Sequence, residues 1–97
     1  MQFVIHAHDG ENMLETRMRV RQKHLENITR LNEEGRVICA GGILDSEGKL
    51  CGSVLIMDFE DRAGVDAYLE SEPYVKEKVW ETITVETMNV VFANKVK

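Results

Sequence analysis

Long apolar runs and an excess of basic residues are both missing from this chain of 97 residues. No apolar run approaches the roughly 20 residues that a membrane-spanning helix needs. The N-terminal MQFVIHAHDG has neither the basic region nor the apolar length of a signal peptide. We therefore expect a cytoplasmic protein with no membrane partner. The net charge of −5, with basic residues mixed among acids, argues against a nucleic-acid partner.

Cysteine is also scarce, and the two that occur are not expected to pair. The turn signal DSEGK lies between Cys39 and Cys51. If it closes a hairpin on Glu47 and Gly48, Cys51 pairs near Leu44, which leaves Cys39 about five residues, or roughly 17 Å, further along. A disulfide needs Cα atoms within about 7 Å. We expect two reduced core thiols and no metal site, because no CxxC spacing is present.

The single proline and the glycines divide the chain into a few elements. Strands are expected at 3–7, in RVICAGGIL and LCGSVLIMDF, and in WETITVETMNVVF, with the middle two forming an antiparallel hairpin. A long helix is expected from about Asn12 to Glu34, ended by Gly35. A second helix is expected to begin at an Asp61 cap and run through Ser71. Pro73 fixes its end by forcing the preceding residue out of the helical region.

The resulting order βαββαβ predicts an α+β, ferredoxin-like fold of one domain, with a four-stranded antiparallel sheet and two helices on one face. The third strand is apolar on both faces, with Val54 and Ile56 on one side and Leu55 and Met57 on the other. A sheet with one wet face does not need this pattern. We therefore expect a homodimer in which two sheets pack face to face as a dimeric α+β barrel.

The apolar row of the first helix contains a histidine. The row follows +4, +4 and +3 steps and comprises Val20, His24, Ile28 and Leu31. Arg17 and Arg21 approach the same side of the helix. An ionisable ring at this position is either a hydrogen-bonded structural histidine or a functional one.

Three segments, RVRQKHLENITRLNEEGRVICAGG, CGSVLIMDFED and SEPYVKEKVWETITV, resemble the YCII-related (YciI-like) family in order and spacing, and the resemblance covers nearly the whole chain. It implies a single dimeric ferredoxin-like domain with an active site built on a helix histidine and the aspartate of an Asp-Pro-Tyr motif. By this resemblance His24 is the histidine, and Glu72 of Glu72-Pro73-Tyr74 stands at the aspartate position. The family's glycine-serine matches Gly52 and Ser53.

The residues also point to a site without the family. Glu70 and Glu72 end a helix, where the macrodipole disfavours a carboxylate by roughly 0.3–1 kcal/mol, so a cationic partner is expected. His24 or Arg21 fits this role, and a carboxylate bound to one imidazole nitrogen would leave the other for proton transfer. The alternative is a solvated Glu72 and a structural His24.

Four further residues are candidate binding groups. Ser53 follows a glycine that lets a ligand or the backbone come close, and its hydroxyl is expected to position substrate. Tyr74 and Trp80 would wall a pocket for a planar ring or fill the core. Asp9 matches an acid common in the resembled family, although its local context favours a turn or an N-terminal cap for the first helix.

His6 and His8 lie two apart on a strand, and we expect no metal there because no third ligand is evident. The chain has no phosphate-binding glycine loop and no dinucleotide fingerprint. The sequence favours a cofactor-independent enzyme doing His24-based acid–base chemistry, of isomerase, lyase or hydrolase type, on a small cyclic or aromatic compound that Arg21 holds. The alternatives are a non-catalytic small-molecule-binding or interaction module and, by fold analogy, an oxygenase that needs no cofactor.

Overall fold

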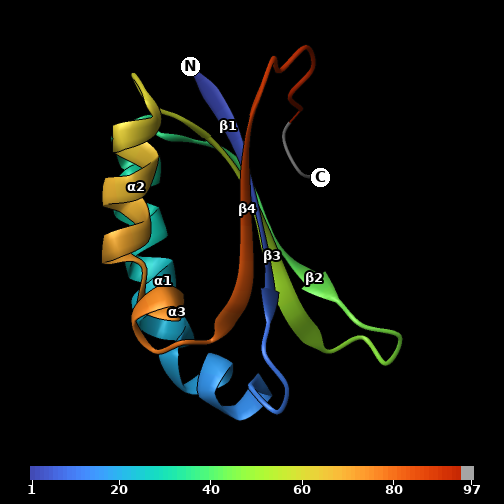
Figure 1. The fold of residues 1–97 in the computed structure, drawn as a ribbon. Helices are drawn as coiled ribbons and strands as arrows, with labels where there is room; N and C mark the ends of the chain where they lie inside the picture. The colour runs from blue at the N-terminus through green and yellow to red at the C-terminus, as the bar shows by residue number, and fades with distance from the viewer. Residues whose placement is uncertain (95–97) are drawn as a thin grey trace.

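In the computed structural model, which describes residues 1–94, one four-stranded antiparallel sheet carries its helices on one face (Figure 1). The strand order is β2-β3-β1-β4. This confirms the predicted ferredoxin-like order, with one additional short helix before the last strand. The elements are β1 (Gln2–Asp9), α1 (Leu14–Glu33), β2 (Val37–Leu44), β3 (Leu50–Asp58), α2 (Arg62–Ser71), α3 (Pro73–Lys76) and β4 (Trp80–Met88).

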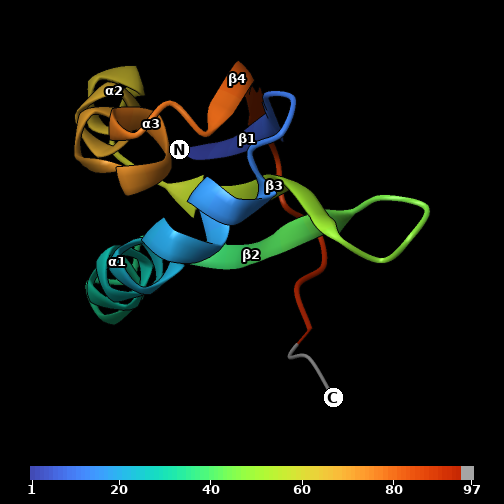
Figure 2. The same cartoon turned by 90° about the horizontal axis from the view of Figure 1, so that it is seen from below.

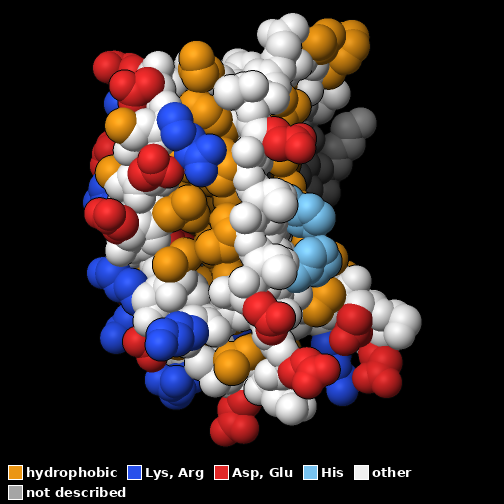
Figure 3. All heavy atoms as spheres, in the orientation of Figure 1, with side chains coloured by type: hydrophobic (Ala, Val, Ile, Leu, Met, Phe, Trp, Pro, Cys, Tyr) orange, Lys and Arg blue, Asp and Glu red, His pale blue; other side chains and the backbone are white. Residues whose placement is uncertain are grey.

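Alternation along β1 separates the two faces of the sheet. Phe3, Ile5 and Ala7 are buried beneath the helices, whereas His6 and His8 lie on the other face and are exposed. Figure 3 shows histidine side chains beside β4, on the side away from the helices. The covered face therefore holds the core, and the opposite face is uncovered in the single chain.

The β2–β3 hairpin has the predicted register over most of its length. Cys39 pairs with Ile56, as a turn centred on Glu47 and Gly48 requires, but a bulge after Ile43 shifts the strand end, so that Leu44 pairs with Leu50. Both cysteines are free, as predicted. Their predicted burial is wrong: Cys39 is exposed, because it lies on the edge strand β2, and Cys51, near the start of β3, is only half-buried.

Helix α1 begins two residues later than predicted. Asn12 has a φ of 58°, which places it in the left-handed region and outside a helix, and α1 starts at Leu14. Its end agrees with the prediction: Gly35 has a φ of 79°, and the Arg36 amide donates to the Leu31 carbonyl.

Helix α2 has the predicted Asp61 cap, whose carboxylate accepts from the Gly64 amide at 3.2 Å. Pro73 ends α2 as expected but also starts α3, since proline suits the first turn of a helix. The chain is extended at Glu72, between the two helices.

The last strand is shorter than predicted. β4 ends at Met88, and Val91 and Phe92, which were expected to belong to it, are exposed beyond it. The Val90 amide instead donates to the Gln2 side chain at 2.7 Å.

The helices divide the covered face between them. Figure 2 shows α1 on the side of β2, and α2 with α3 on the side of β4. In residues 1–94, no helix has the length and apolar character that crossing a membrane demands. The boundary where α1 meets the α2–α3 junction lies above the sheet, and the polar buried residues gather there. The core beneath comprises Phe3, Ile5, Ala7, Val20, Leu31, Leu55, Met57, Phe59, Val65, Tyr68, Tyr74, Val79 and Trp80.

Candidate active site

A buried carboxylate lies at the junction of α2 and α3. Glu72 is 0% exposed. Its side chain accepts hydrogen bonds from the Tyr68 hydroxyl at 2.7 Å and the Tyr74 amide at 3.3 Å, and it contacts His24 Nδ1. A buried carboxylate is tolerated only when such partners compensate its lost hydration. Of the two partners that the helix-end argument offered, Glu72 contacts His24, and the start of α3 adds a backbone donor.

His24 reaches this carboxylate from α1. Its side chain is 12% exposed, and its ring stacks on Tyr74 with centroids 4.2 Å apart and planes inclined by 22°. With Nδ1 engaged by Glu72, no hydrogen bond to Nε2 occurs among the described residues. The carboxylate selects the tautomer that carries the Nδ1 proton, which leaves the Nε2 lone pair free when the ring is neutral.

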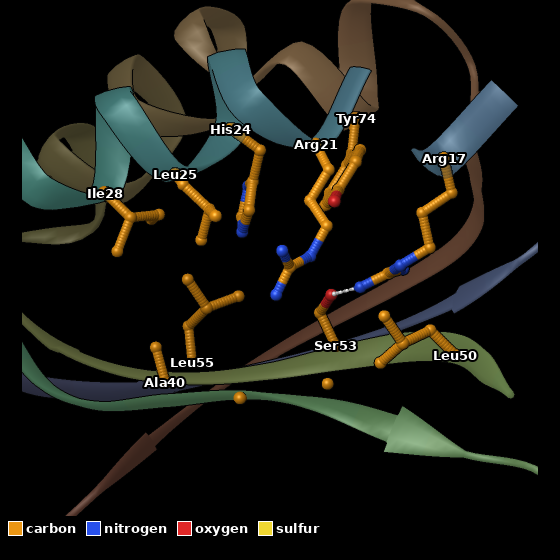
Figure 4. A pocket seen from close by; sticks show the side chains of 12 residues that line it. Arg17, Arg21, His24, Leu25, Ile28, Ala40, Leu50, Ser53, Leu55 and Tyr74 are labelled. Carbon is orange, nitrogen blue, oxygen red and sulfur yellow. Dashed lines mark hydrogen bonds between the residues drawn. The ribbon is translucent and has the colours of Figure 1, made fainter. Parts of the chain in front are cut away.

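A cavity of about 250 Å³ opens beside His24, between α1 and the strands β2 and β3 (Figure 4). Its polar side chains are Arg17, Arg21, His24 and Ser53. Figure 4 shows Arg21 pointing into the middle of this space. The remaining wall is mostly apolar and comprises Leu25, Ile28, Ala40, Gly41, Gly42, Leu50, Leu55 and Tyr74. A small compound that combines an apolar ring with an anionic group matches this lining.

Arg17 is 3% exposed and fixed at both ends of its guanidinium. It donates to Asp9 at 2.8 Å and to the Ser53 hydroxyl at 2.7 Å, and its plane lies 4.5 Å from the centre of the Tyr74 ring. Burial raises the pKa of Asp9 above its usual 3.8, while the Arg17 guanidinium opposes the shift. Burial likewise raises the pKa of Tyr74. Arg17 therefore links Asp9, Ser53 and Tyr74.

Each predicted site residue lines the cavity, stands behind a residue that lines it, or lies outside the site. His24, Arg21, Ser53 and Tyr74 share the cavity wall. Glu72 stands behind His24, and Asp9 stands behind Arg17. The helix-cap interpretation of Asp9 is wrong, because the residue ahead of α1 is Met13 and no side chain caps that end. Asp9 instead belongs to β1, and its carboxylate pairs with Arg17.

Trp80 does not line this cavity. It is 5% exposed and belongs to the core, and its ring lies 6.4 Å from His24 and 5.7 Å from Tyr74, in each case at a steep angle. Trp80 thus packs behind the two stacked rings. This placement matches the core-filling alternative for Trp80, while Tyr74 both fills the core and faces the cavity.

The glycine before Ser53 has a backbone neighbour. A Cβ on Gly52 would lie 2.5 Å from the Ala7 carbonyl oxygen of the adjacent strand. Of the two reasons for a glycine here, close approach of the backbone is the one that the structure supports.

The exposed histidines form a separate pair. The His6 and His8 rings lie 4.8 Å apart on the uncovered face. Across residues 1–94, no three histidine, cysteine, aspartate or glutamate side chains gather as metal ligands. The pair is remote from the His24 cavity, being on the opposite face of the sheet.

Two residues of the site were not chosen from the sequence. Tyr68 precedes Glu72 by four residues and so lies above it on α2, where a hydroxyl-to-carboxylate contact is expected for that spacing. Burial, together with the negative Glu72 beside it, raises the pKa of Tyr68 far above its usual range. Arg17 was recognised beside His24, but its link to Ser53 joins residues 36 apart and has no local signal.

The comparisons with known proteins agree on one family. The YCII-related domain matches residues 1–89. Protein YciI of Escherichia coli is 35% identical over 98 residues, covering 95% of this chain and 100% of that protein. Aspercryptin biosynthesis cluster protein B of Emericella nidulans is 29% identical over 80 residues, which cover 75% of this chain and 51% of that protein.

A solved structure has the same fold. The 5-chloro-2-hydroxyhydroquinone dehydrochlorinase of Burkholderia phenoliruptrix, in complex with 2,5-dihydroxybenzoquinone, superposes with a TM-score of 0.85 at 24% identity. The match covers 92% of this chain and 94% of that chain. At this identity the likeness establishes the fold, whereas the domain match and the relatives establish the family. This chain belongs to the YCII-related family.

Proposed function

We propose that this protein is a small, cofactor-independent enzyme in which His24 performs acid–base chemistry on a small cyclic or aromatic compound. The observation that carries the proposal is the position of His24. One ring nitrogen contacts a fully buried carboxylate, and the same ring lines a cavity. A histidine with a purely structural role needs the first contact but not the second.

The chemistry follows from the arrangement of the dyad. Glu72 accepts a hydrogen bond from Nδ1–H and holds the ring in one orientation, so that Nε2 takes a proton from substrate and later returns it. The carboxylate also stabilises the imidazolium that forms in between. General acid–base catalysis of this kind contributes typically 10²–10⁴-fold in rate. Isomerisation, elimination and hydrolysis are the reaction types that such a group serves.

The cavity lining supports a small cyclic substrate with an anionic group. Arg21 has no carboxylate partner within salt-bridge distance in residues 1–94, so its guanidinium is available to a ligand. Tyr74 offers a ring face, and leucine and isoleucine side chains complete the wall. The ligand bound in the Burkholderia dehydrochlorinase structure is a small hydroxylated quinone, and a relative is named for a biosynthesis cluster. Both support this substrate class.

We also propose that the chain acts as a homodimer joined through the uncovered sheet face. Val4, Val54 and Ile56 lie together in the middle of that face and are only half-buried in the single chain. A second copy that packs its own sheet there would remove these side chains from water.

We place the protein in the cytoplasm. Two free cysteines favour a reducing compartment, because oxidising compartments tend to pair or modify exposed thiols such as Cys39. Cell fractionation with a tagged chain tests the location, and recovery with secreted proteins would contradict it.

A turnover screen tests the proposed activity. Wild type is assayed against lactones, quinols and chlorinated hydroquinones, beside His24→Gln, Glu72→Gln and Glu72→Asp. We expect His24→Gln to abolish turnover, Glu72→Gln to lower kcat by about 10²-fold or more, and Glu72→Asp to be the mildest change, since it keeps the charge. The matched control is His8→Gln on the uncovered face, which should retain full activity.

A non-catalytic binding module would give a different result in the same screen. It predicts that compounds raise the melting temperature of wild type without any turnover, and that His24→Gln lowers this shift. Turnover that survives His24→Gln would contradict the proposed chemistry directly.

A further inference from the structure

Two of the polar groups that face the cavity, Arg17 and Arg21, donate hydrogen bonds and accept none. The two carboxylates of the site are turned away from the cavity wall, Glu72 behind His24 and Asp9 behind Arg17. The wall therefore carries positive charge with no acid beside it, in a space that is otherwise mostly apolar.

The Ser53 hydroxyl has its direction set by Arg17. Arg17 donates to the Ser53 oxygen at 2.7 Å, so this oxygen acts as an acceptor on that side. No hydrogen bond in residues 1–94 has Ser53 as its side-chain donor. Because Ser53 is 2% exposed and lines the cavity, the cavity is where its hydroxyl proton finds an acceptor.

This geometry argues against a nucleophilic serine. A nucleophilic hydroxyl gives its proton to a base within hydrogen-bond reach. The side-chain neighbour that Ser53 contacts is a guanidinium, which accepts no proton, and no hydrogen bond joins Ser53 to the free Nε2 of His24 in residues 1–94.

We propose that Ser53 donates a hydrogen bond to an oxyanion of the substrate, and that Arg17 is the positioning residue that holds the hydroxyl in this role. The ligand class is a small cyclic compound with a carboxylate, enolate or phenolate oxygen. This inference rests on the proposed function and specifies where the charge of its reaction goes.

The reaction then balances without an oxidant or reductant. His24 Nε2 removes a proton from carbon next to a carbonyl group, and the electron pair of that C–H bond moves onto the carbonyl oxygen. The Ser53 hydroxyl and the nearby guanidiniums stabilise the resulting enolate oxygen, as donors do in an oxyanion hole. Return of the proton to another carbon completes an isomerisation. In an elimination the enolate re-forms the carbonyl, a β-substituent leaves with its electron pair, and His24 gives its proton to that leaving group or to water.

Binding of three probes tests the inference without requiring turnover. The probes are benzoate, ionised 2,5-dihydroxybenzoquinone and neutral benzamide, measured by calorimetry with wild type, Ser53→Ala and Ser46→Ala. We expect at least one anion to bind, benzamide to bind at least tenfold more weakly than benzoate, and Ser53→Ala to weaken the anion about tenfold or more. Ser46→Ala, in the exposed β2–β3 turn, should bind like wild type. Comparing the two anions distinguishes a carboxylate from an enolate oxygen.

A double-mutant cycle isolates the role of Arg17. Arg17→Lys keeps the charge but cannot bridge Asp9 and Ser53, so we expect it to weaken the anion about as much as Ser53→Ala, with little further loss in the double variant. Equal losses for benzoate and benzamide, additive losses in the cycle, or unchanged anion binding in Ser53→Ala would each overturn the inference. Ser53-dependent anion binding combined with turnover that survives His24→Gln would refute the proposed catalysis and leave this oxyanion site standing.

Discussion

On the sheet face that the helices cover, Ile5 and Ala7 are fully buried, whereas His6, which lies between them on β1, points to the other face and is exposed. Two charged side chains buried on the covered face each lie in a hydrogen-bonded cluster: Glu72 with His24, Tyr68 and the Tyr74 amide, and Arg17 with its two partners. On the uncovered face, His6 and His8 stand beside one another with no carboxylate bound to either ring in residues 1–94. Histidine is therefore held by a buried carboxylate on one face and, in this part of the chain, lacks such a partner on the other.

This contrast shows which histidine can be assigned a function from the chemistry of its surroundings. His6, His8 and His24 are the three histidines of the chain. Only the last combines burial, a charged partner and a cavity, which are the features that turn an imidazole into an oriented acid or base.

The largest expected effect comes from breaking the paired cluster on the covered face. Arg17→Met leaves the Asp9 carboxylate buried without its partner, and we expect unfolding free energy to fall by about 3–5 kcal/mol. Thr29→Ser on the exposed face of α1 should change it by less than about 0.5 kcal/mol. Urea unfolding of both variants measures the contrast. Equal small losses would mean that the Arg17 cluster contributes no more than the exposed face.

The uncovered face is expected to matter for association instead. Val54→Glu places a charge in the middle of the proposed interface, and we expect dimer affinity to fall at least 100-fold, or about 2.7 kcal/mol. The control is Thr29→Glu on the exposed side of α1, which should leave the dimer intact. Light scattering across micromolar concentrations reports the mass. A wild-type monomer in that range would remove the interface.

Alkaline pH tests the buried tyrosines of the covered face. Tyr68 and Tyr74 have pKa values raised by burial, so both remain neutral in the folded chain when they would ionise in the unfolded one. The stabilising contribution is fully present below pH 10, the usual pKa, and is lost as the pH rises above it. We expect Tyr68, whose pKa is raised far above its usual range, to contribute a loss of about 1.4 kcal/mol per pH unit, and Tyr74 to add to the loss until the pH passes its own raised pKa.

Urea unfolding between pH 9 and 11, with absorbance at 295 nm, checks this expectation. Tyrosine ionisation should coincide with unfolding rather than precede it. Tyr68→Phe loses the hydrogen bond to Glu72 and so is less stable at pH 8, but its stability should fall less steeply with pH. Parallel slopes for the two proteins would contradict the assignment.

The smallest expected effect concerns the exposed histidine pair. We expect a strong chelator to leave stability and any activity unchanged, because His6 and His8 have no third ligand within the described part of the chain. Thermal unfolding and turnover with and without chelator measure this. Activity lost on chelation and restored by zinc would reverse the conclusion.

Local signals in the sequence predicted much of the fold. The turn chemistry around Gly48 predicted the hairpin of β2 and β3, and Asp61 marked the start of α2, because caps and turns depend on a few neighbouring residues. The same local reasoning failed where tertiary contacts decide. β4 stops at Met88 although an apolar run continues beyond it.

The site residues likewise divide into those that the sequence identified and those whose partners only the tertiary structure shows. The family resemblance paired His24 with Glu72, whereas the helix-end argument left His24 and Arg21 both open as the partner, and the structure brings His24 and Glu72 together. Asp9 was assigned to a local cap because nothing in its neighbourhood identifies a partner that arrives from α1. Trp80 was equally suited to a pocket or a core, and only the packing of Tyr74 against it decides which it joins.

The central claim is that Glu72 orients His24 and leaves Nε2 free, and long-range ¹H–¹⁵N spectra of the imidazoles test it most directly. At a pH where the ring is neutral, we predict the Nδ1–H tautomer for His24 in wild type, and a shift toward the Nε2–H tautomer in Glu72→Gln. His6 and His8 should be unchanged and serve as internal controls. An Nε2–H tautomer for His24 in wild type, or the same tautomer mixture in both proteins, would contradict the dyad and favour a structural role for His24.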